Sequence, residues 1–83
     1  MIIVGYRYVN FTNKDSGELV EFAEIYLGNK SDESKHEYGV QIERVTMGKN
    51  NYEQYNLNEL MNEKTQLMPI YNRFGKCQGL MKL

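Results

Sequence analysis

The chain opens with the segment IIVGYRYVNFT, from Ile2 to Thr12, which is crowded with β-branched and aromatic residues. Such residues suit a pleated, half-buried surface, so this segment predicts a first strand. Residues 13–17 (NKDSG) accept turn geometry, and Leu19–Leu27 (LVEFAEIYL) returns to a strand pattern. Together these segments predict a β-hairpin.

A third strand pattern lies beyond a polar connector. Residues 28–37 (GNKSDESKHE) contain no large apolar side chain, which predicts an exposed loop. Strand signal resumes over Tyr38–Met47, but its apolar alternation changes phase between Ile42 and Val45. We expect a β-bulge near residues 43–44 to absorb the change of phase.

The last third of the chain predicts one short helix and a second hairpin. Asn56 stands three residues before Glu59, as in a capping box, so a helix is expected from about residue 57. Residues 67–71 and 77–83 read as strands around a turn at 72–76. Gly75 can supply the positive φ that a tight turn often needs. Pro69 lacks an amide donor, so its strand should be an edge or should leave the proline unpaired.

The predicted order is therefore three strands, a helix and two strands, within a single domain over residues 1–83. This order matches the small five-stranded OB-like barrel, a mainly β fold with its helix between strands 3 and 4. An open α+β sheet with the same element order is the alternative, because strand signals do not reveal which strands pair.

The composition argues against an enzyme and against a metal or other cofactor. The chain has one cysteine, Cys77, and one histidine, His36, too few for a structural zinc site of four Cys and His ligands. No glycine-rich phosphate loop is present. A lone cysteine fits a reducing cytoplasm, and no apolar run approaches the roughly 20 residues that span a bilayer. We therefore expect a cytoplasmic binding protein without a membrane partner.

Charge is strongly segregated along the chain. Residues 1–14 and 64–83 carry six basic and no acidic side chains, whereas residues 15–63 hold all eleven acidic residues against four basic ones, a net −7. Single-stranded nucleic acid is held by cations on its backbone and by aromatic rings under its bases. The sequence thus predicts a nucleic-acid-binding surface built from the two ends of the chain: Tyr6, Arg7, Tyr8, Tyr71, Arg73, Phe74 and Lys76.

Strand parity leaves one question open within this surface. Tyr6 and Tyr8 share one face of the first strand, and Arg7 lies on the other face. Either face of this strand can supply the core, so Tyr6 and Tyr8 are either core residues or surface residues. The strongest signal is Arg73-Phe74, because an aromatic ring beside cations in a tight turn has little structural reason to be there.

The end motifs GYRYVNF (residues 5–11) and YNRFGK (residues 71–76) resemble small phage and mobile-element proteins of Gram-positive bacteria. The layout is also similar to the single-stranded-DNA-binding proteins of filamentous phages, which are small OB-type barrels that dimerise and coat DNA. The resemblance implies an accessory protein of DNA replication that binds single-stranded DNA, with a homodimer as an option. The acidic middle segment departs from that pattern.

The acidic middle segment suggests a second hypothesis, in which the chain is a phage-encoded inhibitor of a host defence protein such as a nuclease. Its carboxylates would then mimic the charge of DNA. The residues that would supply this charge are Glu18, Glu21, Glu24, Asp32, Glu33, Glu37 and Glu43.

Overall fold

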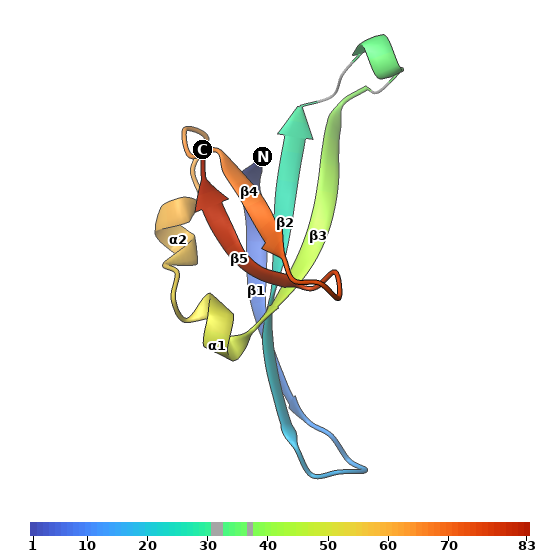
Figure 1. Cartoon of the computed structure of the whole chain (residues 1–83), viewed down its shortest axis with the longest axis vertical. Helices are drawn as coiled ribbons and strands as arrows, with labels where there is room; N and C mark the ends of the chain where they lie inside the picture. The colour runs from blue at the N-terminus through green and yellow to red at the C-terminus, as the bar shows by residue number, and fades with distance from the viewer. Residues whose placement is uncertain (31–32, 37) are drawn as a thin grey trace.

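A computed structural model describes residues 1–30, 33–36 and 38–83 of the chain. The protein is mainly β, as predicted, and its strands form two antiparallel sheets (Figure 1). The three-stranded sheet has the order β1-β2-β3, with β1 at Ile2–Thr12, β2 at Leu19–Lys30 and β3 at Val40–Gly48. The two-stranded sheet pairs β4 (Leu67–Tyr71) with β5 (Cys77–Lys82), and the helices are η1 (Glu33–Lys35), α1 (Lys49–Tyr52) and α2 (Leu57–Leu60).

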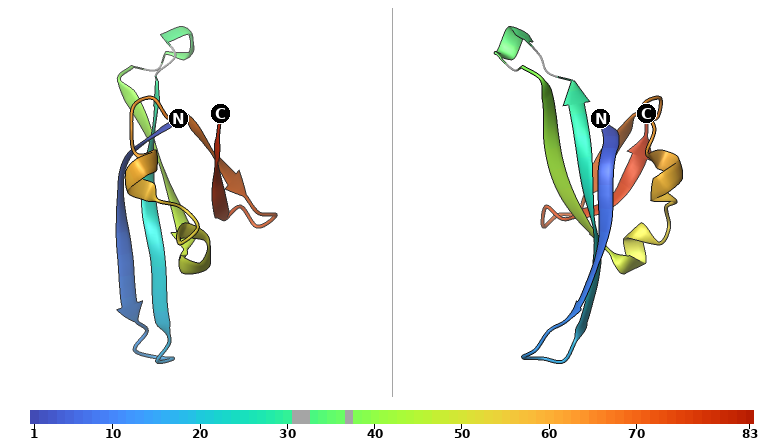
Figure 2. Two further views of the ribbon diagram at one scale, coloured as in Figure 1. Left: turned by 90° about the vertical axis from the view of Figure 1, so that its left-hand side faces the viewer. Right: turned by 180° about the vertical axis from the view of Figure 1, so that it is seen from behind.

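The core lies between the two sheets. The β4–β5 hairpin crosses one face of the three-stranded sheet, and α1 and α2 close one side (Figures 1 and 2). In β2, alternate residues from Ala23 to Leu27 are fully buried on this inner face, as the two-residue period of a strand requires. The buried apolar residues are Ile3, Ala23, Ile25, Leu27, Val45, Met47, Leu57, Leu67, Cys77 and Leu80.

The distal half of the β1–β2 hairpin projects beyond this core as a two-stranded ribbon (Figure 1). No residue from 9 to 22 is buried. The radius of gyration is 14.6 Å, with extents of 49 × 26 × 24 Å, whereas a compact chain of this length has about 12 Å. The molecule is therefore elongated along the ribbon.

The predicted bulge in β3 is wrong. β2 and β3 pair without a register shift from Val40 to Gly48, and the one interruption in the β1–β2 ladder lies between Ile3 and Gly5. The change of phase in β3 has a different cause: Ile42 is 54% exposed on the outer face, whereas Val45 and Met47 are buried on the inner face. Only the end of β3 that holds Val45 and Met47 packs against the core. The apolar residues can therefore change from one face to the other along β3 without a bulge.

A closed barrel is not confirmed, since the described strands form two separate sheets. The predicted helix is present between β3 and β4 as the single turn α2, with the Asn56 side chain accepting from the Glu59 amide at 3.3 Å. Pro69 lies in a two-stranded sheet, where each strand is an edge, as expected. No helix among the described residues is long and apolar enough to cross a membrane.

Candidate nucleic-acid interface

The β4–β5 turn carries an aromatic ring and two cations on a hydrogen-bonded backbone. Asn72 organises the turn: its Oδ1 accepts from the amides of Phe74 at 2.9 Å and Lys76 at 3.0 Å. The Asn72 backbone amide donates to the Lys76 carbonyl at 2.9 Å. Gly75 has a φ of +78°, the positive value that the sequence predicted for this tight turn. We call Arg73, Phe74 and Lys76 the hairpin tip.

The hairpin tip exposes both its ring and its charge. Phe74 is 73% exposed, and the guanidinium carbon of Arg73 lies 4.9 Å from the centre of its ring, a cation–π arrangement. Among the described residues, no acidic side chain forms an ion pair with Arg73 or Lys76. The positive charge of the tip is therefore available to an external anion.

A cleft of about 490 Å³ lies beside the tip, between the edge of β3 and the start of β5. The residues that line it include Phe22, Asn51 and Gln78, and Lys76 at the base of the tip. Amide side chains donate and accept hydrogen bonds, as the edges of nucleobases do. The cleft thus continues the surface of the tip with groups suited to bases and phosphates.

Tyr6 and Tyr8 lie on the inner face of β1, which answers the question of parity. Tyr6 is half-buried against the core, and Tyr8 is 54% exposed at the root of the ribbon. The Tyr8 ring centre lies 5.7 Å from that of Tyr6 and 5.1 Å from that of Tyr52 in α1. Partial burial raises the pKa of Tyr8. These three rings form a second aromatic surface, separate from the tip.

Arg7 lies on the opposite face of β1 and is occupied by an internal ion pair. Its Nε donates to Glu24 Oε2 at 2.7 Å, the Tyr26 hydroxyl donates to the same oxygen at 2.7 Å, and Arg44 lies 3.8 Å from Oε1. Hydrogen bonds from Arg7 and Tyr26 lower the pKa of Glu24 to about 2. Arg7 therefore balances a carboxylate of the sheet rather than facing the tip.

Tyr71 is also engaged within the protein. Its hydroxyl donates to Glu43 Oε1 at 2.7 Å, and this hydrogen bond, with burial, raises the pKa of Tyr71 to about 12. The contact ties the end of β4 to β3 just before the tip. Tyr71 therefore supports the hairpin tip from beneath and is 44% exposed there.

The seven predicted residues do not share one surface. β1 and β3 are the two edges of the three-stranded sheet, and the hairpin tip protrudes on the β3 side, away from β1 (Figures 1 and 2). The structure brings together Tyr71, Arg73, Phe74 and Lys76, and it places Tyr6 and Tyr8 elsewhere on the inner face. Arg7 is on the outer face of the sheet.

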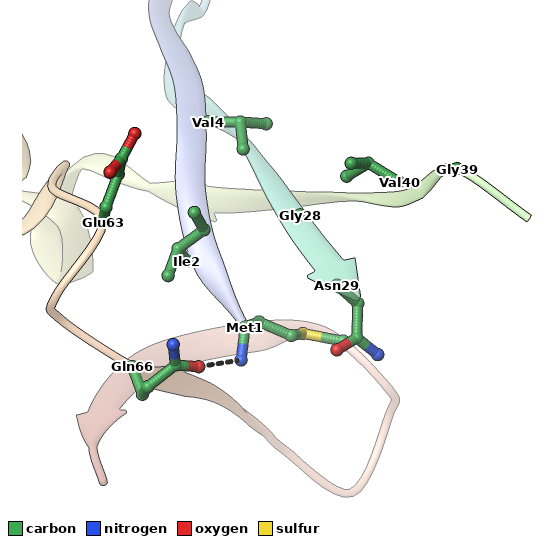
Figure 3. Close-up of a pocket in the computed structure, with 9 residues that line it drawn as sticks. All are labelled: Met1, Ile2, Val4, Gly28, Asn29, Gly39, Val40, Glu63 and Gln66. Carbon is green, nitrogen blue, oxygen red and sulfur yellow. Dashed lines mark hydrogen bonds between the residues drawn. The ribbon is translucent and has the colours of Figure 1, made fainter. Parts of the chain in front are cut away.

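Another pocket, of about 350 Å³, opens at the start of β1 (Figure 3). Ile2, Val4 and Val40 close around Gly28, where an added Cβ would lie 2.7 Å from Val4 Cγ1. The described residues that line it include the Glu63 carboxylate and no lysine or arginine. Apart from the Met1 ammonium, which donates to Gln66 Oε1 at 3.1 Å, the described lining offers no cation to a phosphate backbone.

The acidic residues of the inhibitor hypothesis are partly neutralised within the fold. Glu24 is buried and forms ion pairs with Arg7 and Arg44. Glu21 forms an ion pair with Lys49 at 3.0 Å, and Glu43 accepts a hydrogen bond from the Tyr71 hydroxyl. Asp32 and Glu37 lie outside the described residues, as does the Glu33 side chain. Glu18, beside the ribbon turn, is exposed. Of the four described carboxylates, three are therefore engaged within the fold, and the exposed Glu18 forms no ion pair with another described residue.

The sequence analysis missed the residues that complete the site: Asn72 in the turn, and Phe22, Asn51 and Gln78 in the cleft. Asn72 could have been found, because asparagine before a glycine turn commonly caps the backbone through its side chain. The cleft residues come from β2, α1 and β5 and carry no local signal. Comparisons with protein-family models, curated proteins and solved structures found no match.

Proposed function

We propose that the protein binds single-stranded nucleic acid through the hairpin tip and the adjoining cleft. The observation that carries the proposal is Phe74, whose ring is 73% exposed on a hydrogen-bonded turn between Arg73 and Lys76. Neither cation forms an ion pair with an acidic side chain among the described residues. Hydrogen bonds to Asn72 hold the backbone of the turn beneath this ring, so little backbone conformational entropy is lost when a base stacks on it. Its cations are placed for the neighbouring phosphates.

The binding step follows from these groups. A base stacks on Phe74, Arg73 and Lys76 contact the flanking phosphates, and the amides of Asn51 and Gln78 meet a neighbouring base in the cleft. Stacking is tolerant of sequence, because every base presents a π-face. Binding should therefore show little sequence preference and should fall with salt.

The wider role is part of the same proposal. The protein acts by binding rather than by catalysis, as a cytoplasmic accessory factor in the DNA replication of a phage or mobile element, with an OB-like arrangement of its strands. Supporting it are the acid-free ends of the chain, the reduced thiol of Cys77 and the mainly β architecture. Single-stranded DNA is the proposed partner.

The experiment is a fluorescence-anisotropy titration of a labelled oligothymidylate with the wild type and Phe74→Ala at low salt. Loss of one stacking interaction should cost roughly 1–3 kcal/mol, a loss of affinity of roughly fivefold to 150-fold. Tyr38→Ala is the matched control, because Tyr38 is 69% exposed and lies in the acidic part of the chain. The proposal fails if the folded wild type does not bind, or if both substitutions weaken binding equally.

A further inference from the structure

Two hollows meet at Lys76, where the β4–β5 turn protrudes past the edge of β3 (Figure 1). The first is the cleft that adjoins the hairpin tip. The second, of about 260 Å³, opens between β3 and the turn, and Arg44 lines it. Lys76 and Thr46 line both hollows. A strand of nucleic acid that leaves the cleft past Lys76 therefore arrives beside Arg44.

The second hollow leads from one side of the three-stranded sheet to the other. Val45 and Met47 of β3 are buried on the inner face, so Arg44 and Thr46, which alternate with them, belong to the outer face. The cleft is instead lined in part by residues of β5 and α1, which lie over the inner face. The two hollows together thus run from the inner side of the sheet, around the edge of β3, to Arg44.

The Arg44 guanidinium is available to an external anion. Its Nη1 lies 3.8 Å from Glu24 Oε1, which is beyond hydrogen-bond distance, and the side chain is 62% exposed. Arg7 Nε and the Tyr26 hydroxyl each donate to Glu24 Oε2 at 2.7 Å, so Glu24 already has a cation beside it. Two arginines then oppose one carboxylate, and this cluster leaves a net charge of +1 on the outer face.

The second hollow is also positive, although Glu43 lines it. The Glu43 carboxylate accepts a hydrogen bond from the Tyr71 hydroxyl at 2.7 Å, which holds it toward β4. Arg44 and Lys76 oppose this carboxylate, so the described lining has a net charge of +1. A guanidinium presents paired N–H donors that match the oxygens of a phosphate. The charge and the chemistry of Arg44 therefore suit a phosphate of a bound strand.

We propose that Arg44 forms a second phosphate-binding site for the nucleic acid held at the hairpin tip, and that the path around β3 selects single strands over duplexes. The inference rests on the proposed function. Duplex DNA has a persistence length of about 50 nm, whereas the protein measures only 26 × 24 Å across its long axis. A duplex held at the tip continues straight past the edge of β3, and a flexible single strand bends around it to reach Arg44.

An acidic peptide also carries negative charge, but the groups along the path favour nucleic acid. The path begins at the exposed Phe74 ring, and the cleft beside it is lined by Asn51 and Gln78. A nucleotide brings a base for such groups together with each phosphate, whereas an acidic peptide engages only the cations. Nucleic acid therefore uses the rings, the amides and the cations of this surface together.

Fluorescence anisotropy with two labelled oligothymidylates, of about four and about twelve nucleotides, tests the inference. At roughly 0.7 per phosphate contact, the short probe should give a logarithmic salt slope of roughly −1.4 and the long probe roughly −2.1. Arg44→Ala should reduce the slope of the long probe to roughly −1.4 and leave the short probe unchanged. Arg44→Lys keeps the charge and should keep the steeper slope. Lys14→Ala, which removes the same charge at the exposed turn of the ribbon, should change neither slope.

Two competitors complete the test, and circular dichroism reports whether each variant is folded. A duplex of the longer length should bind more weakly than the single strand, with a slope that Arg44→Ala does not change. A polyglutamate peptide should not displace the long probe. An unchanged slope of the long probe in Arg44→Ala, beside normal binding of the short probe, overturns this inference and leaves the proposed function standing. Equal effects of Arg44→Ala on duplex and single strand, or displacement by polyglutamate, also overturn it. A wild type that binds neither probe overturns both proposals.

Discussion

Gly79 in β5 lies against the hydroxyl of Tyr55, and this close approach makes a two-residue prediction. A Cβ at position 79 would lie 2.8 Å from Tyr55 Oη, whereas its next neighbours, Ile70 Cδ1 and Tyr55 Cζ, are at 3.7 and 3.9 Å. The same hydroxyl accepts the Leu80 amide at 3.2 Å. Gly79→Ala must therefore displace the hydroxyl and break that hydrogen bond.

The structure gives the size of each effect. Tyr55→Phe removes the acceptor of the Leu80 amide, and an unsatisfied buried amide costs about 1–3 kcal/mol. Gly79→Ala should lose the same hydrogen bond, offset by about 0.4–1 kcal/mol from the smaller conformational entropy of the unfolded chain. In the Tyr55→Phe background no hydroxyl obstructs the new methyl group. There Gly79→Ala should stabilise the protein by about 0.5 kcal/mol.

The assay is urea unfolding of the wild type, both single variants and the double variant. All four are compared at one protein concentration and in one buffer. Gly79→Ala should lower the free energy of unfolding in the wild type and raise it in the Tyr55→Phe background. An equal change in the two backgrounds, within about 0.3 kcal/mol, would refute the reasoning, because independent sites add.

Two more predictions concern the stability of the sheet and of the core. The pKa of Glu24 is lowered from 4.5 to about 2, so its ion pair stabilises the folded state above pH 4.5 and this contribution is lost as pH falls toward 2. Unfolding measured across that range should show a smaller loss of stability in Glu24→Gln than in the wild type, and parallel curves would contradict the role of the ion pair. Leu57→Ala should cost about 2–5 kcal/mol in urea unfolding, because Leu57 is 1% exposed and anchors α2 in the core; a cost below about 1 kcal/mol would show that α2 does not depend on this contact.

Much of the fold was predictable from local pattern. The bounds of β1 and β4 match the predicted segments, and the β4–β5 turn forms around Gly75 as expected. The helix α1 was missed, because its four residues, Lys49–Tyr52, carry no apolar periodicity and bury no side chain. The packing of the two sheets against each other was not predictable, because it depends on contacts between residues that are far apart in the sequence.

The candidate site was predictable where it is local. Arg73, Phe74 and Lys76 are neighbours in one turn, so their shared surface follows from the sequence. Joining them to Tyr6 and Arg7 required a closed barrel, and the structure instead separates β1 from the tip by the width of the three-stranded sheet. The partners of Arg7 come from other strands, beyond the reach of sequence pattern.

The salt dependence of binding to a short oligothymidylate tests the central claim most directly, because it counts phosphate contacts at the hairpin tip. Each contact on single-stranded DNA contributes roughly 0.7 to the logarithmic slope, so Arg73 and Lys76 together predict roughly −1.4. Arg73→Ala should reduce the slope to roughly −0.7, whereas Lys64→Ala, beyond the opposite end of the β4–β5 hairpin, should leave it unchanged. An unchanged slope in Arg73→Ala, or a flatter slope in Lys64→Ala alone, would contradict nucleic-acid binding at the tip.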